Sequence, residues 1–214
     1  MRIGIFEDNS ALRSAMVEHF EIVGHKVVFN YDSLTGSAYK YVEEGPDFIF
    51  LDIHLKKDNG LTSIKDLKSQ FINAEIIVIT GDLLNQNYML DAVKLGAAGF
   101  VYKPFSMKDL EATMEKIRLY GSYMEPENMA KLFSVISGNH EDDKKLSKRI
   151  SDALSPKERE IVQLIVQGLS YKQMSDKLNI SYHTVNHHLK SVYIKLDVKS
   201  KSELMVRYFT KNKV

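Results

Sequence analysis

Five short segments rich in β-branched or aromatic residues alternate with amphipathic helical patterns over residues 1–120. The segments predicted to be strands are Arg2–Phe6, Lys26–Asn30, Asp47–Asp52, Glu75–Thr80 and Gly99–Lys103. Apolar residues spaced three or four apart predict helices, and these patterns lie at Leu12–Val23, Lys40–Glu44, Ile64–Leu67, Met89–Val93 and Leu110–Ile117. Five strand–helix units favour an α/β fold, a doubly wound parallel sheet with right-handed crossovers.

Polar side chains end four of these strands. Glu7 and Asp8 follow the first strand, Asp52 ends the third, Thr80 the fourth and Lys103 the fifth. In a parallel sheet these ends meet at one edge, where open α/β sheets place their sites. Three close carboxylates raise one another's pKa unless a cation lies among them, and an oxygen-only ligand set suits Mg²⁺. A carboxylate beside Mg²⁺ and a lysine is well placed to attack a phosphoryl group.

Each of these residues also has an ordinary structural role. Asp8 is placed to cap the first helix, Thr80 to begin a turn, and Lys103 to be a solvated lysine before Pro104. The functional interpretation rests on five suitable residues at the strand ends together. We therefore expect Asp52 to be a covalently modified switch.

The C-terminal part has a different pattern, in which helix starts recur. Ser155 with Glu158 and Ser170 with Gln173 have the spacing of capping boxes, and Ser181 can cap a further helix. The helices are predicted at about 156–167, 171–178, 182–196 and 201–210. A short turn between the second and third of them is typical of a helix-turn-helix.

The third of these helices has one apolar and one polar face. Val185, Leu189, Val192 and Leu196 share a narrow arc that must face a core. The opposite arc carries His183, Asn186, His187, Lys190 and Ile194. Such a face suits base edges and phosphates in a major groove. The alternative is an amphipathic helix with a solvated face.

Charge distribution supports a polyanionic partner for this part alone. Residues 1–120 hold 13 lysines and arginines against 17 acidic residues, whereas residues 154–214 hold 11 against 5. The chain has no cysteine, which excludes thiolate chemistry and a disulfide framework. No signal peptide or membrane-length apolar run is expected, so a cytoplasmic protein without a membrane partner is predicted.

Residues 1–121 resemble the receiver domain of a bacterial two-component response regulator. The resemblance rests on Glu7-Asp8, Leu51-Asp52-Ile53, Thr80 and Lys103-Pro104. It implies that Asp52 is the phosphoacceptor and that Thr80 and Lys103 contact the phosphoryl group. It further implies Mg²⁺ held by Glu7, Asp8, Asp52 and the backbone carbonyl of His54, and a switch role for Phe100. By the same resemblance, the bond between Lys103 and Pro104 is cis.

Residues 151–214 resemble a LuxR-type helix-turn-helix domain. The resemblance is carried by Leu154–Glu160, Gly168-Leu169-Ser170, Ile180-Ser181, Thr184–His188 and Lys195-Leu196. It implies base contacts by Asn186, His187 and Lys190, and candidate phosphate contacts by Thr184, Lys172 and Lys195. The whole chain therefore resembles a NarL/FixJ-family response regulator, with a (βα)5 flavodoxin-like receiver followed by a four-helix domain.

Residues 122–150 are predicted to be a linker with a helix at about 126–136, acting either as a lever or as a loose tether. The resemblance implies a DNA-binding regulator rather than an enzyme. A partner histidine kinase would phosphorylate Asp52, and phosphorylation would control homodimerisation and binding to double-stranded promoter DNA. The dimer surface stays open. Two alternatives remain, an orphan regulator that binds DNA constitutively and a Mg²⁺-dependent phosphohydrolase of the haloacid-dehalogenase type. A phosphohydrolase of this type would need a second Asp at position 54, which is His in this chain.

Overall fold

The computed structural model describes residues 1–35, 43–56, 58–81, 86–124 and 153–209. Five parallel strands form one sheet in the order β2-β1-β3-β4-β5. Their bounds are β1 Arg2–Phe6, β2 Lys26–Tyr31, β3 Phe48–Asp52, β4 Glu75–Thr80 and β5 Ala97–Tyr102. The α/β prediction is confirmed. The strand order reverses between β1 and β3, and a doubly wound sheet binds its ligands at such a point.

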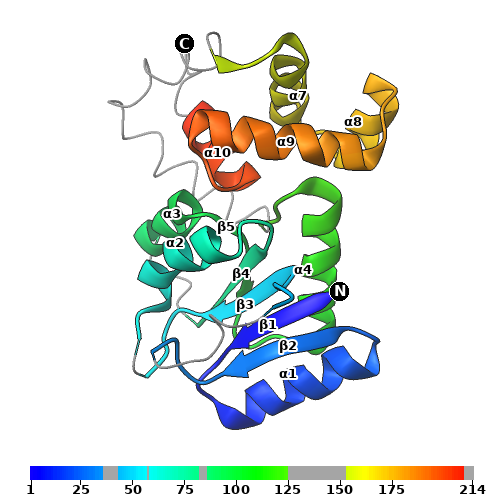
Figure 1. Cartoon of the computed structure of the whole chain (residues 1–214). Coiled ribbons are helices and arrows are strands. Elements are labelled where there is room, and N and C mark those ends of the chain that lie inside the picture. The colour runs from blue at the N-terminus through cyan, green and yellow to red at the C-terminus, as the bar shows by residue number, and fades with distance from the viewer. Residues whose placement is uncertain (36–42, 57, 82–85, 125–152, 210–214) are drawn as a thin grey trace.

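Four described helices cover the two faces of the sheet (Figure 1). They are α1 Ser10–Ile22, α2 Gly60–Gln70, α3 Gln86–Leu95 and α4 Met107–Tyr120. Strand β3 shows how both faces are used, because its side chains alternate between them. Phe48 and Phe50 join the core under α1 and α4, while Ile49 and Leu51 join the core under α2 and α3. This burial on both faces explains why β3 is an uninterrupted apolar run.

Four more helices form the C-terminal domain, which has a core of its own. They are α7 Pro156–Val166, α8 Tyr171–Leu178, α9 Tyr182–Leu196 and α10 Lys201–Phe209. Capping boxes are present at Ser155 with Glu158 and at Ser170 with Gln173, as predicted. The four predicted helices are confirmed, with ends that differ by one residue at most.

Some expectations meet a different outcome. Asn9, not Asp8, caps α1, because its side-chain oxygen accepts the backbone N–H of Leu12 at 3.1 Å. The side chain of Asp8 is thereby left for the strand-end cluster. The helical pattern at Lys40–Glu44 lies largely outside the described residues, and Glu43 and Glu44 form a bend. The helix predicted at about 126–136 also lies outside them.

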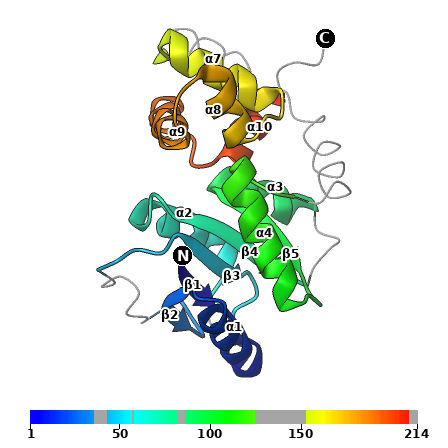
Figure 2. The same cartoon turned by 90° about the vertical axis from the view of Figure 1, so that its right-hand side faces the viewer.

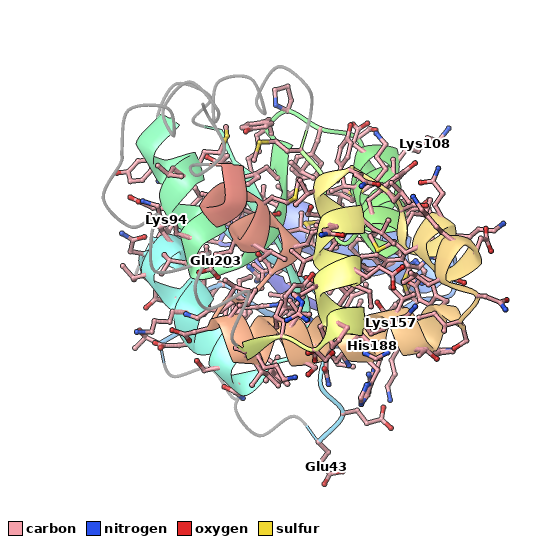
Figure 3. All side chains as sticks on the ribbon, turned by 90° about the horizontal axis from the view of Figure 1, so that it is seen from above. Glu43, Lys94, Lys108, Lys157, His188 and Glu203 are labelled. Atoms are coloured by element: carbon pink, nitrogen blue, oxygen red, sulfur yellow. The ribbon has the colours of Figure 1, made fainter. Side chains whose placement is uncertain are left out.

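The C-terminal domain packs on the amino-terminal edge of the sheet, opposite the strand ends that carry Asp52. Helix α10 lies against α3 and the start of β5, and Figure 3 shows Glu203 of α10 close to α3, which carries Lys94. Val206 of α10 belongs to the receiver-side core that also holds Phe100. Figure 2 shows the same stacking of the two domains from the side.

Two hydrogen bonds from the C-terminal domain end on helix α4. The hydroxyl of Tyr182 donates to the carbonyl of Arg118 at 2.8 Å, and the ammonium group of Lys201 donates to the carbonyl of Tyr120. The last carbonyls of a helix have no partner within it. Helix α4 is therefore capped by the other domain.

Candidate functional site

Glu7, Asp8 and Asp52 come together at the carboxyl edge of the sheet. One carboxylate oxygen from each lies within 4.8 Å of the other two. Glu7 and Asp52 are buried, and Asp8 is half-buried. Strands β1 and β3 are neighbours, so residues that are far apart in the chain become one acidic cluster.

Lys103 supplies a cation to this cluster. Its ammonium group lies 2.7 Å from Glu7 Oε2 and 2.7 Å from Asp52 Oδ2. Lys56 is more distant, with its ammonium group 3.8 Å from Asp8 Oδ2. The bond between Lys103 and Pro104 is cis, as expected. Lys103 therefore neutralises part of the charge of three carboxylates.

The pKa values of Glu7 and Lys103 both rise. Burial raises the pKa of Glu7 and the charge of Asp52 adds to the rise, while hydrogen bonds from Lys103 and Asn9 oppose it. Burial acts to lower the pKa of Lys103, but its hydrogen bonds to Asp52 and Glu7 outweigh burial and raise it. One lysine thus faces a cluster of three carboxylates, and such a set of oxygen ligands suits a divalent cation.

Local backbone contacts hold the carboxylates in place. The N–H of His54 donates to Asp52 Oδ1 at 2.8 Å, and the N–H of Asn9 donates to Glu7 Oε1 at 3.1 Å. The side chain of His54 itself is exposed. Helix α2 starts against the site at Gly60, where a Cβ would come within 2.4 Å of the Asp52 carbonyl oxygen. Only glycine allows the helix to begin this close to Asp52.

Thr80 lies at the end of β4, the strand beside β3, and Phe100 lies on the next strand, β5. Both are buried, and the carbonyl of Thr80 accepts the N–H of Lys103 at 2.8 Å. The ring of Phe100 is part of the core that also contains Val206 of α10. A continuous apolar core therefore extends from β5 to helix α10 of the C-terminal domain.

On helix α9 the residues divide as the helical periodicity predicts. Val185, Leu189, Val192 and Leu196 are buried. His187 and Lys190 are exposed, and Asn186 and Thr184 are half-buried. Lys172 of the preceding helix α8 is also exposed. The exposed groups of α9 form one stripe of hydrogen-bonding and cationic side chains.

Lys195 has a partner that the sequence did not reveal. Its ammonium group lies 2.8 and 2.7 Å from the two carboxylate oxygens of buried Glu158, which also accepts the hydroxyl of Ser191 at 2.6 Å. Glu158 was predicted only as part of a capping box. Its position 37 residues from Lys195 left no local signal. The phosphate contact proposed for Lys195 stays a prediction.

Two family matches cover most of the chain. Residues 3–115 match the response regulator receiver domain, and residues 152–208 match the bacterial regulatory proteins of the luxR family. Within the described residues, no helix is both long and apolar enough to span a membrane.

Individual relatives are similar over three quarters of the chain or more. The nitrate/nitrite response regulator protein homolog of Haemophilus influenzae is 26% identical over 215 residues, covering 100% of this chain and 98% of its own. Escherichia coli NarL, a nitrate/nitrite response regulator, is 29% identical, covering 75% of this chain and 72% of its own. RcsB of Salmonella enterica serovar Typhimurium, solved bound to promoter rprA, has a TM-score of 0.52 at 24% identity, covering 98% of both chains.

Proposed function

The chain belongs to the NarL/FixJ family of DNA-binding response regulators, and we propose that phosphorylation of Asp52 by a partner histidine kinase controls its action on transcription. The observation that carries the proposal is the placement of Lys103 against both Asp52 and Glu7 at 2.7 Å. The family acts by regulating transcription and not as metabolic enzymes, so the phosphohydrolase alternative is set aside.

Asp52 acts as the nucleophile in this proposal. One of its carboxylate oxygens attacks the phosphorus of the kinase phosphohistidine, the bond between phosphorus and nitrogen breaks, and the imidazole leaves. Lys103, now paired with Asp52, then contacts an oxygen of the transferred group and offsets its charge. The hydroxyl of Thr80 donates a second hydrogen bond to the same group.

The same cluster fits Mg²⁺. Three carboxylates within reach of one another support this choice, because Mg²⁺ prefers oxygen ligands and is held by carboxylates. Glu7, Asp8, Asp52 and the carbonyl of His54 would hold the ion. When bound, it neutralises charge on the phosphoryl oxygens.

Phe100 and Val206 are proposed to carry the change to the C-terminal domain. Both belong to one hydrophobic core. A movement of Thr80 toward the phosphoryl group would repack Phe100, and this would also disturb the packing of α10 on the receiver. The packed interface has discrete arrangements and does not deform continuously. Phosphorylation would therefore shift the position of the C-terminal domain or favour a homodimer.

DNA contact is proposed for the exposed stripe of α9. Asn186, His187 and Lys190 would read bases, and Thr184, Lys172 and Lys195 would contact phosphates. DNA is the partner that RcsB holds in its solved structure. A dimer would place two such helices on two half-sites of double-stranded promoter DNA, in the cytoplasm.

The test compares wild type with Asp52→Asn, using acetyl phosphate as the phosphodonor and Mg²⁺ in the buffer. Wild type should gain one phosphoryl group by intact mass and bind promoter DNA more tightly by fluorescence anisotropy. Asp52→Asn should show neither change. Asp66→Asn, which changes an exposed carboxylate on α2, is the control and should behave as wild type. An Asp52→Asn protein that still responds to acetyl phosphate would refute the proposal.

DNA contact is tested separately by the salt dependence of binding. Lys172→Ala should lower the slope of log affinity against log salt by about 1, the value that corresponds to one phosphate contact. Lys177→Ala removes another exposed lysine of α8 and should leave the slope unchanged. Equal slopes for the two variants would remove Lys172 from the DNA interface.

A further inference from the structure

A cavity of about 450 Å³ lies between the two domains. One wall comes from the end of α2 and the residues after it, and the other from α9 and the residues after it. Its volume lies within the range of small-molecule sites, roughly 300–1,000 Å³. Glu7, Asp8, Asp52 and Lys103 are not among the described residues that line it.

Apolar side chains from both domains line this cavity and remain open to solvent. Ile72 on the receiver wall is 67% exposed, and Ile194 on the α9 wall is 71% exposed. Val198 also lines the cavity, but it is buried, with 5% of its surface exposed. Large aliphatic side chains that stay exposed on both sides of one cavity form a surface that an apolar ligand would cover.

Positive charge predominates among the described residues that line the cavity. They include Lys68, Lys190 and Lys199 against one carboxylate, Asp197. Lys68 is already engaged, because its ammonium group donates to the carbonyl of Ala74 at 2.8 Å. The ammonium groups of Lys190 and Lys199 have no hydrogen bond or ion pair within the described part of the chain. An apolar ligand with an anionic end matches this lining.

We propose that this cavity binds a small amphiphilic carboxylate, and that the ligand holds the reading face of α9 against the receiver. The apolar part of the ligand lies between Ile72 and Ile194, and its carboxylate pairs with Lys190 and Lys199. Lys190 is also a proposed base contact, so ligand and DNA compete for the same side chain. The competition rests on the proposed function, whereas binding of the ligand does not.

Binding is tested by calorimetric titration of the full chain with octanoate, with octylamine as the cationic analogue. Octanoate should bind at one site per chain, and octylamine at least 10-fold more weakly. Ile72→Asp should weaken octanoate at least 10-fold. Ile22→Asp changes an equally exposed isoleucine on α1, 75% exposed and outside the cavity, and should leave binding unchanged.

Three results would overturn the proposal. They are no saturable heat with octanoate, equal affinity for octylamine, or octanoate affinity that Ile72→Asp does not alter. A second pair of variants tests the charge. Lys199→Glu should weaken octanoate, while Lys65→Glu, an exposed lysine of α2 outside the cavity, should not.

The competition is measured on DNA. Octanoate should weaken promoter binding of wild type at least 5-fold and should have no effect on Ile72→Asp, whose substitution lies on the receiver. If calorimetry shows binding and DNA affinity does not change, the locking role is wrong although the site is present. If the chain binds no DNA at all, the proposed function fails while the calorimetric result stands.

Discussion

At the level of single residues, the phosphoacceptor site depends on the position of one ammonium group. Lys103 lies 2.7 Å from both Glu7 and Asp52, and these carboxylates are buried. Buried carboxylates that lose their cation repel one another without solvent screening. The same lysine is thus a structural partner of both carboxylates in this structure, and in the proposed function it becomes a contact of the phosphoryl group.

Replacement of Lys103 should expose this dependence. Lys103→Met is expected to lower the free energy of unfolding by about 3 kcal/mol without Mg²⁺, and Mg²⁺ should restore much of it because the metal replaces the missing charge. Urea unfolding with and without Mg²⁺ measures both effects. Lys108→Met, on the exposed side of α4, is the control. A Lys103→Met protein as stable as Lys108→Met would contradict the argument.

Glu158 gives the second prediction for a single residue. Burial raises its pKa, but hydrogen bonds from Lys195, Ser191 and Ser155 outweigh burial and lower the pKa to about 2. A depressed carboxyl pKa stabilises the fold above the unfolded value of 4.5, and that stability is lost as pH falls toward 2.

The loss amounts to about 3 kcal/mol between pH 4.5 and 2. Glu158→Gln should be less stable than wild type at pH 6, and the difference should shrink across this window. Unfolding in urea at several pH values measures it. Glu160→Gln, an exposed neighbour, should show no such convergence. If the difference in unfolding free energy between wild type and Glu158→Gln does not change with pH, the lowered pKa of Glu158 is contradicted.

At the level of helices and strands, the helix ends decide how the domains meet. Helix α4 ends at Gly121, whose φ is +76°, and α7 is followed by Gly168, whose φ is +79°. Both positions favour glycine. They differ in their surroundings, because a Cβ on Gly121 would overlap the hydroxyl of Tyr171 in α8, while one on Gly168 would meet nothing within 4 Å.

This pair separates backbone strain from the interdomain contact. Gly168→Ala should lower the free energy of unfolding by about 1 kcal/mol, because alanine is strained in the left-handed conformation. Gly121→Ala should have the same effect and also push α8 away from the receiver. Thermal unfolding compares the two variants, and small-angle scattering should show a larger radius of gyration only for Gly121→Ala. Equal radii for both would mean that the contact at Tyr171 does not hold the domains together.

At the level of the whole molecule, the domain interface contains a buried amine. Lys201 is 5% exposed and donates to the carbonyl of Tyr120. Burial lowers the pKa of Lys201 to about 8. Burial also raises the pKa of Tyr193 well above its ordinary value. The amine of Lys201 is therefore harder to protonate than an ordinary lysine, and the phenol of Tyr193 is harder to deprotonate than an ordinary tyrosine.

These shifts predict how stability depends on pH. Between pH 8 and 10.5 the unfolded chain keeps the Lys201 proton that the folded chain has released, so stability should rise with pH. Above about pH 10 the unfolded tyrosines ionise while Tyr193 does not, and stability should fall. Chemical unfolding from about pH 7 to 11 should show a maximum between these two limits. Lys201→Met should reduce the increase in stability between pH 8 and 10.5. If the increase is unchanged in this variant, it comes from another titrating group.

Much of the fold and of the phosphoacceptor cluster was predictable because the signals are local. Alternating apolar segments predicted the strands, Ser155 with Glu158 predicted a helix start, and the residues ending the strands predicted the acidic edge. The phosphate contact of Lys195 was expected from the resemblance to a LuxR-type domain. Its carboxylate partner comes from another helix, which no spacing indicates.

By itself, the sequence determined the two fold classes, the carboxylates and lysine at the sheet edge, and the polar face of α9. Periodicity, capping and strand ends are properties of neighbouring residues, so they can be read along the chain. Only the tertiary structure decided that Lys201 caps α4 from 81 residues away, and that Ile72 and Ile194 line one cavity. Those contacts depend on how the two domains pack together, and such packing leaves no local pattern in the sequence.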